Sequence, residues 1–348
     1  MGRRKGCKNK LTKDQVKNIK EDINLDKSVK EHVETSSEKI ELTKEQLERK
    51  EKLNSTLKGL NSTLGKDSIK YANTIEIRQR IPFKQKCLTT LTGGGIPKGL
   101  HTVIWGSKSC GKTTIVLDLI AEAQKSGNQC AYINGERSYD PLYAQKRGVD
   151  TESLVIVDVE TLEQGLDAMI KLCRESVVDL IIFDSLHGLA PKGELYAGKG
   201  EKEKSTSDSN MALRARALTQ YFEMGMSFVS KAKCAIVLIA QSRMDLGAFV
   251  KLETLTGGHA LLHNSRLTLR FRRGQKADAP VEVKMTDKPK TDKDGTILRD
   301  KKGNIRYEEE KIQVGFDFVA HVDKSQIDGC TEGNEIHIAF YFAEGIKE

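Results

Sequence analysis

The stretch Gly106-Ser-Lys-Ser-Cys-Gly-Lys-Thr-Thr114 decides the fold, because it matches the pattern G-x-x-x-x-G-K-[ST] between two contrasting segments. His101–Trp105 has the composition of a buried strand, and Thr113–Lys125 carries apolar residues at helical spacing before Gly127. In a strand, loop and helix of this order, backbone N–H groups and the helix N-terminus face phosphate groups. The alternative is a Gly-rich turn that matches by chance.

The loop supplies the first candidate site residues. Lys112 is expected to reach the β- and γ-phosphate oxygens of ATP, and the Thr113 hydroxyl is expected to hold Mg²⁺. The complete candidate nucleotide-binding set in the loop is Gly106, Ser107, Lys108, Ser109, Cys110, Gly111, Lys112, Thr113 and Thr114.

A second candidate metal residue follows a buried strand. Leu180–Phe183 is a run of four apolar residues that leads directly into Asp184. A carboxylate at the C-terminal edge of such a strand is the usual partner of a phosphate loop, and we expect Asp184 to support the Mg²⁺. The alternative is that Asp184 only caps the next turn.

Composition limits the class of protein. The 348 residues carry a net charge of +8, which permits a polyanionic partner without requiring one. Seven cysteines without a C-x-x-C pair indicate neither a disulfide framework nor a zinc knuckle. No apolar run has the length of a membrane span, and the N-terminus lacks the apolar core of a signal peptide. We therefore expect a cytoplasmic protein, in a bacterial cell or an infected host, with no membrane partner.

Three regions are predicted along the chain. Residues 1–42 are a charged, flexible extension, whose basic start either contacts nucleic acid or is only solvated. Residues 43–85 contain an amphipathic helix over Thr43–Leu64 and an isolated strand over Ala72–Phe83. Residues 86–348 form the core.

The core alternates strands and helices, which predicts an α/β fold with a mostly parallel central sheet flanked by helices. The strands are expected at Cys130–Asn134, Leu154–Asp158, Leu180–Phe183 and Cys234–Ala240, and the helices at Pro141–Arg147, Leu162–Arg174 and Met211–Lys231. A polar segment over 192–209 is expected to be mobile. Period-two alternation predicts antiparallel strands at Arg266–Arg273, Val281–Met285, Lys311–His321 and Glu335–Phe342, with a protruding hairpin or loop over 287–302.

Five motifs in collinear order, between Thr43 and Ile346, resemble the bacterial RecA recombinases and their phage-encoded relatives. They are GSKSCGKTT, INGERSYDPLYAQKRGVD, VVDLIIFDSLHGL, VLIAQSRMDLG with TGGHAL, and HVDKSQI with FAEGI. The resemblance implies a RecA-type P-loop NTPase core, preceded by a helix and strand used for polymerisation. The sequence stops soon after the core, so we expect no separate C-terminal domain, and with the basic N-terminal extension this favours a phage or other mobile-element origin.

The resemblance also implies catalytic roles. Glu136 would polarise the attacking water, and it stands two residues past a strand beside the phosphate loop, where a water-orienting base is reasonable. Gln241 would sense the γ-phosphate, and Lys324 would be donated to the ATP of the neighbouring subunit. Gln326 occupies the position of a second donated cation, so one charge acts for two or another basic residue substitutes.

Tyr143 would stack on adenine, with Asp140 beside it. Taken singly, a tyrosine in the place of Tyr143 is more often a helix-packing residue, and Gln241 is more often a polar strand end.

Two loops would bind DNA. The second loop offers Arg243, Met244, Phe249, Lys251, Gly257 and Gly258. The first offers Lys199, Lys202 and Lys204, but it also contains Glu194, Glu201 and Glu203 and is alternatively a solvated loop. Both loops depart in length from the family pattern, the first being longer and the second shorter.

The function implied is an ATP- and Mg²⁺-dependent DNA recombinase. It would form helical filaments on single-stranded DNA and pair them with homologous duplex DNA, assisted by a single-strand-binding protein and a loader. The alternatives are a ring-forming motor of the helicase kind and a protein that coats single-stranded DNA without hydrolysing ATP.

Overall fold

The computed structural model describes residues 43–65, 69, 71–195, 206–244, 253–255, 258–275, 279–291, 297–300 and 304–346. The chain divides into two compact units, residues 1–77 and 78–348. The predicted extension over 1–42 lies outside the described residues.

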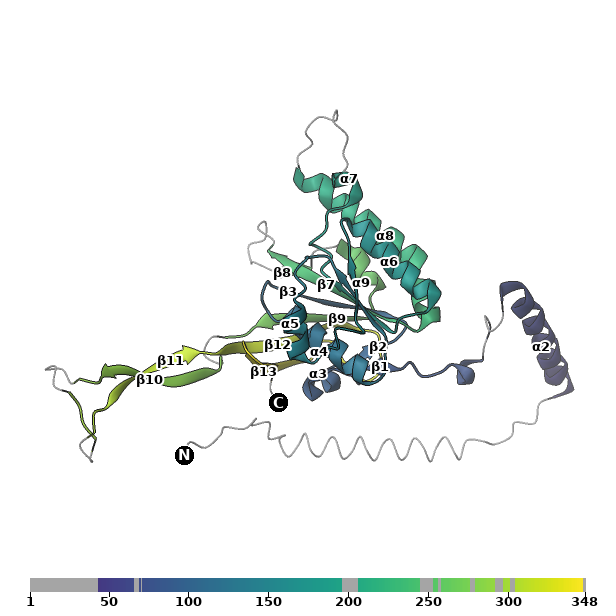
Figure 1. Ribbon diagram of the computed structural model, residues 1–348. Helices are drawn as coiled ribbons and strands as arrows, with labels where there is room; N and C mark the ends of the chain where they lie inside the picture. Colours follow the sequence, from purple (N-terminus) through teal and green to yellow (C-terminus); the bar gives the residue numbers. More distant parts are fainter. Residues whose placement is uncertain are drawn as a thin grey trace. The chain divides into compact units, whose positions relative to one another are not determined.

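The first unit contains helix α2 (Lys44–Leu64), which confirms the predicted N-terminal helix (Figure 1). Its first turn is closed by a capping box, in which the backbone N–H of Thr43 donates to the Gln46 side chain at 2.9 Å and the Gln46 N–H donates to the Thr43 hydroxyl at 3.4 Å. No side chain of α2 is buried, and four of its leucines are exposed: Leu47, Leu53, Leu60 and Leu64. The apolar stripe of the helix is therefore available to another surface.

The expected strand over Ala72–Phe83 is wrong for most of its length. Ala72–Thr74 is a 3₁₀ turn, η1, and only β1 (Arg80–Ile81) pairs, with β2 (Ile96–Pro97) of the same chain. Residues 75–79, between η1 and β1, form no β-ladder with the other described residues. The side chains of Ile75 and Ile77 are 66% and 96% exposed. A strand requires a neighbouring backbone with which to pair, and among the described residues β2 offers one only to Arg80 and Ile81.

In the second unit, the main sheet of the described residues has ten strands in the order β14-β13-β12-β9-β3-β7-β6-β4-β5, with β8 beside β7. The six strands from β9 to β5 are parallel. At one edge β12 and β13 are antiparallel, as predicted, and β14, which was not predicted, extends them. Arg266–Arg273 was expected to be an antiparallel strand, but β9 is antiparallel only to β12 and is parallel to β3. Their bounds are β3 His101–Gly106, β4 Cys130–Asn134, β5 Val155–Asp158, β6 Leu180–Asp184, β7 Ala235–Met244, β8 Glu253–Leu255, β9 Leu267–Arg273, β12 Gly315–Ser325, β13 Glu335–Tyr341 and β14 Gly345–Ile346.

Helices cover both faces of this sheet, because the buried strands are apolar on both sides. One core lies under α3 (Lys86–Leu91), α4 (Lys112–Lys125) and α5 (Pro141–Arg147). The other lies under α6 (Leu162–Glu175), α8 (Thr206–Ala232) and α9 (Gly258–Asn264). The polar segment predicted over 192–209 contains α7 (Lys192–Leu195) and the first turn of α8, which begins five residues before the expected Met211. Residues 196–205 lie outside the described residues.

The hairpin predicted over 287–302 belongs to a two-stranded ribbon, β10 (Val281–Pro289) with β11 (Tyr307–Gln313), which extends away from the sheet (Figure 1). The single strand expected over Lys311–His321 is wrong, because β11 ends at Gln313 and β12 begins at Gly315. At Gly315 a Cβ atom would lie 1.9 Å from the Phe340 carbonyl oxygen. Glycine therefore allows the chain to pass from the ribbon into the main sheet at this close approach.

A buried ion pair joins the elements behind the phosphate loop. Asp118 of α4 is fully buried, and its carboxylate accepts from the Arg147 Nε at 2.8 Å, from the Arg147 Nη2 and from the Gln85 Nε2 at 2.6 Å. The Arg147 Nη1 also donates to the Glu344 carbonyl oxygen, in the turn between β13 and β14. Arg147 thus links α4, α5 and the antiparallel edge of the sheet.

We expect Arg147→Met to destabilise the protein by up to about 3–5 kcal/mol, because the buried Asp118 carboxylate loses its guanidinium partner and keeps only one cation, the partly exposed Lys84 ammonium, 3.7 Å away. Urea denaturation measures this loss. Lys125→Met is the control, since Lys125 pairs with Glu122 on the surface at 3.1 Å and such a pair contributes at most about 1 kcal/mol. Equal unfolding free energies for the two variants would contradict the assignment of Arg147 as a structural link.

Candidate functional site

The phosphate loop joins β3 to α4 and is folded around Lys112, whose Nζ donates to the carbonyl oxygens of Gly106 at 3.0 Å and Ser107 at 2.7 Å. Gly111 precedes the helix in the left-handed conformation, with φ of 93°. A Cβ atom at Gly111 would lie 2.8 Å from the Phe340 ring. The glycine is needed both for its φ and for this approach, which leaves the loop backbone open to a ligand.

Asp184 stands at the end of β6, and its carboxylate is held from two sides. The Thr113 hydroxyl donates to Oδ2 at 2.7 Å, and the Tyr132 hydroxyl of β4 donates to the same oxygen at 2.8 Å. Burial raises the pKa of Asp184, and the nearby Glu136 adds to the shift. A cation beside this carboxylate would favour its charged form, so Thr113 and Asp184 together could hold Mg²⁺ as the sequence predicts.

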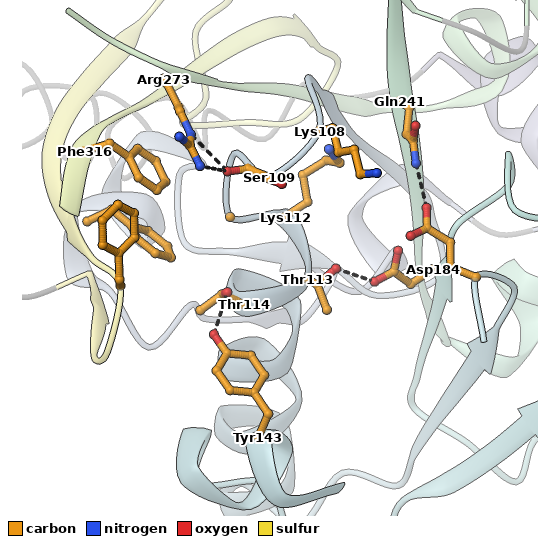
Figure 2. A pocket seen from close by; sticks show the side chains of 14 residues that line it. Lys108, Ser109, Lys112, Thr113, Thr114, Tyr143, Asp184, Gln241, Arg273 and Phe316 are labelled. Carbon is orange, nitrogen blue, oxygen red and sulfur yellow. Dashed lines mark hydrogen bonds between the residues drawn. The ribbon is translucent and has the colours of Figure 1, made fainter. Parts of the chain in front are cut away.

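Glu136 lies beside Asp184, just past the end of β4. Its backbone N–H donates to the Asp184 carbonyl oxygen at 3.1 Å, and its Oε1 accepts from the Ser185 hydroxyl and from the Gln241 Nε2, the latter at 2.7 Å. Figure 2 draws this last bond as a dashed line from Gln241. Gln241 comes from β7, whose C-terminal end meets this edge of the sheet. The structure therefore brings Glu136, Asp184 and Gln241 together from three parallel strands.

Tyr143 points toward the phosphate loop from α5, where its hydroxyl lies 2.8 Å from the Thr114 Oγ1 (Figure 2). Asp140 lies outside the pocket lining and caps the helix, since its Oδ1 accepts from the N–H groups of Leu142 at 2.9 Å and Tyr143 at 3.1 Å. Asp140 therefore positions Tyr143 and has no side-chain contact with the pocket.

Four residues at the site were missed by the sequence prediction. Arg273, at the end of β9, donates from Nε and Nη2 to the Ser109 carbonyl oxygen at 3.1 and 2.7 Å. Its guanidinium carbon lies 4.5 Å from the centre of the Phe316 ring, which stacks on Phe340 at 4.6 Å. Phe342 completes this aromatic wall. All four lie in segments that period-two alternation predicted as strands, and alternation by itself indicates no ligand role.

These groups line one cavity of about 270 Å³. Its lining includes Lys108, Ser109, Gly111, Lys112, Thr113, Thr114, Glu136, Tyr143, Asp184, Gln241, Arg273 and the three phenylalanines. Gly106, Ser107 and Cys110 of the predicted set do not line it, and burial raises the pKa of the Cys110 thiol. The loop backbone, two lysines, a hydroxyl and carboxylate pair, and aromatic rings fit a Mg²⁺-bound nucleotide.

Lys324 lies outside this lining. Its Nζ donates to the carbonyl oxygens of Leu262 and of His263, the latter at 3.2 Å, at the C-terminal turn of α9. Partial burial, and then the neighbouring Arg266, lower the pKa of Lys324. The Arg266 Nη1 donates to the Gln326 Oε1, so an exposed guanidinium stands at the position where the second donated cation was expected.

Most of the predicted DNA contacts lie outside the described residues, namely Lys199, Lys202, Lys204, Phe249, Lys251 and Gly257. The backbones of Arg243 and Met244 form the end of β7 and pair with Thr254 and Glu253 of β8. Gly258 begins α9. Among the described helices, none combines the length and apolar character needed to cross a membrane.

We expect Arg273→Ala to weaken nucleotide binding about tenfold, because the loop loses two hydrogen bonds to Ser109 and the aromatic wall loses its guanidinium. Calorimetric titration with Mg²⁺-ATP measures the affinity. Arg272→Ala is the matched control, since the adjacent Arg272 pairs with Glu335 at 3.1 Å and does not line the cavity. The same affinity in both variants would show that Arg273 plays no part in the site.

The chain matches known proteins over most of its length. Residues 51–304 match the family model described as the RecA N-terminal domain. "Protein RecA" of Agrobacterium fabrum is 36% identical over 232 residues, 65% of this chain and 62% of that protein. "Protein RecA" of Brucella anthropi is 37% identical over 227 residues, which are 64% of this chain and 61% of that protein. "Protein RecA" of Rickettsia africae is 41% identical over 181 residues, which are 52% of this chain and 51% of that protein. The matches therefore span less than two thirds of the length of these relatives. Because the family model matches more than half of this chain, the chain belongs to the RecA family.

Proposed function

We propose that this protein is an ATP-dependent DNA recombinase, which forms filaments on single-stranded DNA and catalyses pairing and strand exchange with a homologous duplex. The observation that carries the proposal is the hydrogen bond between Glu136 and Gln241. Glu136 stands beside the phosphate loop, and Gln241 lies on the strand that leads into the second predicted DNA loop. The proposed water-orienting carboxylate is thereby connected to the strand that leads into a proposed DNA-binding loop.

In this proposal the cavity binds ATP. The loop N–H groups and Lys112 hold the phosphates of ATP. The adenine ring lies between Tyr143 and the aromatic wall of Phe316, Phe340 and Phe342. Bound at Thr113 and Asp184, Mg²⁺ would neutralise charge on the phosphate oxygens. Glu136 accepts a proton from the attacking water, and Ser185 and Gln241 fix the orientation of its carboxylate.

The γ-phosphate would compete with Glu136 for the Gln241 amide. Gln241 is two residues from Arg243 on β7, and the Gln241 N–H donates to the His187 Nδ1 at 3.3 Å. His187 follows β6, on the chain that leads toward the first predicted DNA loop. A shift of Gln241 toward a phosphate would therefore move the starting points of both loops.

Filament formation needs a surface and a segment that occupies it. β5 is the outer strand of the main sheet, and Val155 on it is 46% exposed. An apolar groove beside it is lined by Val157, Leu172 and Val177. The extended residues around Ile75 and Ile77 of another subunit would complete this edge by strand addition, and the exposed leucines of α2 would add apolar contact.

The proposal assigns two cations to the nucleotide of the neighbouring subunit. Lys324 is one, and Arg266 is the other, because its guanidinium contacts Gln326 and lies close enough to Lys324 to lower the pKa of that lysine. Cations at a γ-phosphate stabilise the charge that develops in the transition state and also make ATP a link between subunits.

The test is ATP hydrolysis with and without single-stranded DNA, followed by strand exchange on homologous and heterologous duplexes. A recombinase hydrolyses ATP faster on single-stranded DNA and exchanges strands only on the homologous duplex. A ring motor would separate duplex strands without requiring homology, and a coating protein would bind DNA with no turnover. Either result would overturn the proposed function.

We expect Glu136→Gln to bind ATP and DNA and to hydrolyse ATP about 10²–10⁴ times more slowly, because the amide cannot accept the proton from water. Filaments of this variant should be long-lived. Single-turnover hydrolysis and electron microscopy are the measurements, and Glu152→Gln, at an exposed position outside the cavity, is the control. Hydrolysis at the wild-type rate would place the base elsewhere.

We expect Lys324→Ala to lose DNA-stimulated hydrolysis while an isolated subunit still binds ATP, since Lys112, Thr113 and Asp184 are unchanged. A mixture of Lys324→Ala with Lys112→Ala should recover part of the activity, because one subunit keeps an intact phosphate loop and the other keeps the cation. Lys324→Arg controls for the loss of the Lys324 contacts to α9. Co-assembled mixtures that show no recovery would exclude action between subunits.

A further inference from the structure

The ribbon formed by β10 and β11 has no role in the proposed ATP site. Its strands pair from Val281 with Gln313 to Pro289 with Tyr307. A nine-residue strand spans about 30 Å, at roughly 3.3 Å per residue. Figure 1 shows the ribbon extending away from the ten-stranded sheet. Its far end therefore lies at a distance from the cavity.

At the far end, three stretches of backbone meet. The Lys290 N–H donates to the Arg306 carbonyl oxygen at 2.7 Å, the Leu298 N–H donates to the Lys290 carbonyl oxygen at 2.8 Å, and the Arg306 N–H donates to the Leu298 carbonyl oxygen at 2.9 Å. Beyond this junction the chain makes two short bridges, Thr291 with Ile297 and Arg299 with Ile305. The ribbon thus divides into two arms that are joined by backbone hydrogen bonds.

The side chains at the junction are basic. Lys290, Arg299 and Arg306 are all exposed, and we call them the ribbon tip. Asp300 is half-buried and accepts from the Asn304 N–H at 3.0 Å and from the Asn304 side chain at 3.2 Å. In the sequence, residues 288–306 carry seven basic and three acidic side chains, whereas Glu308, Glu309 and Glu310 follow on β11. Positive charge is therefore concentrated at the tip.

The ribbon begins at the same edge of the sheet as the ATP site. β9 leads toward it and ends at Arg273, whose guanidinium contacts Ser109 of the phosphate loop. β6 and β7, which lead toward the two predicted DNA loops, run parallel to β9 and also end at this edge. The base of the ribbon therefore lies at the edge from which the other DNA contacts are proposed to arise, and the tip extends away from that edge.

We propose that the ribbon tip binds the phosphate backbone of duplex DNA. The major groove of duplex DNA admits a two-stranded ribbon, and basic side chains on such a ribbon contact phosphates. Binding of single strands uses aromatic platforms on which successive bases stack, whereas the sequence over 281–313 has one aromatic residue, the exposed Tyr307 beside Arg306. The choice of a nucleic acid as the polyanion rests on the proposed function, and the choice of the duplex rests on the two-stranded form of the ribbon.

The test is the triple variant Lys290→Gln, Arg299→Gln and Arg306→Gln in the full chain. We measure fluorescence anisotropy with a 30-base-pair duplex and with a single strand of the same length, over a series of salt concentrations. Duplex binding should weaken, and the slope of log affinity against log salt should fall by up to about 2.7, if each side chain neutralises one phosphate. Single-strand affinity and DNA-free ATP hydrolysis should be unchanged.

A control triple variant, Lys86→Gln, Lys125→Gln and Lys231→Gln, removes the same charge from exposed positions of the core. A conservative variant, Lys290→Arg, Arg299→Lys and Arg306→Lys, should keep the wild-type slope. An unchanged duplex slope in the first variant, an equal loss in the control, or an equal loss on single-stranded DNA would overturn the proposal. Wild-type protein that binds single strands but not the duplex would also overturn it and leave the proposed ATPase intact.

Discussion

The carboxylate of Asp184 is the contact on which the candidate site depends. Its Oδ2 accepts from Thr113, at the start of α4, and from Tyr132, on β4, at 2.7 and 2.8 Å. Three elements are thereby fixed around one buried oxygen whose ionisation burial opposes. Because β6 ends here between β4 and β7, Glu136 and Gln241 are brought to the same place without any further contact being needed.

The opposite wall of the cavity depends on the antiparallel edge of the sheet. Phe316 and Phe340 stack at 4.6 Å, and Arg273 connects them to the carbonyl oxygen of Ser109. Behind this wall, Arg147 binds Asp118 of α4 and the Glu344 carbonyl oxygen. One buried guanidinium thus holds both α4, which follows the phosphate loop, and the strands that carry the aromatic rings. We expect a displacement of either part to shift the other.

The proposed subunit contacts and DNA contacts come from parts that the main sheet does not bury. Ile75, Ile77 and the leucines of α2 are exposed, and β5 offers an outer strand. Arg266 and Lys324 lie side by side at the end of α9, away from the cavity of their own chain. In a monomer, the exposed apolar side chains contact water, and the two neighbouring cations repel each other; both are unfavourable. In the proposed filament, the apolar side chains would be covered and the cations would face a phosphate.

The sequence by itself determined the phosphate loop, the parallel strands and the carboxylates that end them. These features follow from local spacing, and the C-terminal ends of parallel strands must share an edge, so Glu136, Asp184 and Gln241 were predictable as a group. Tertiary structure decided that Arg273 reaches Ser109, 164 residues away, and that Arg266 meets Gln326, 60 residues away. It also decided that Ala72–Phe83 is mostly without a ladder, because alternation indicates a face but supplies no neighbouring strand.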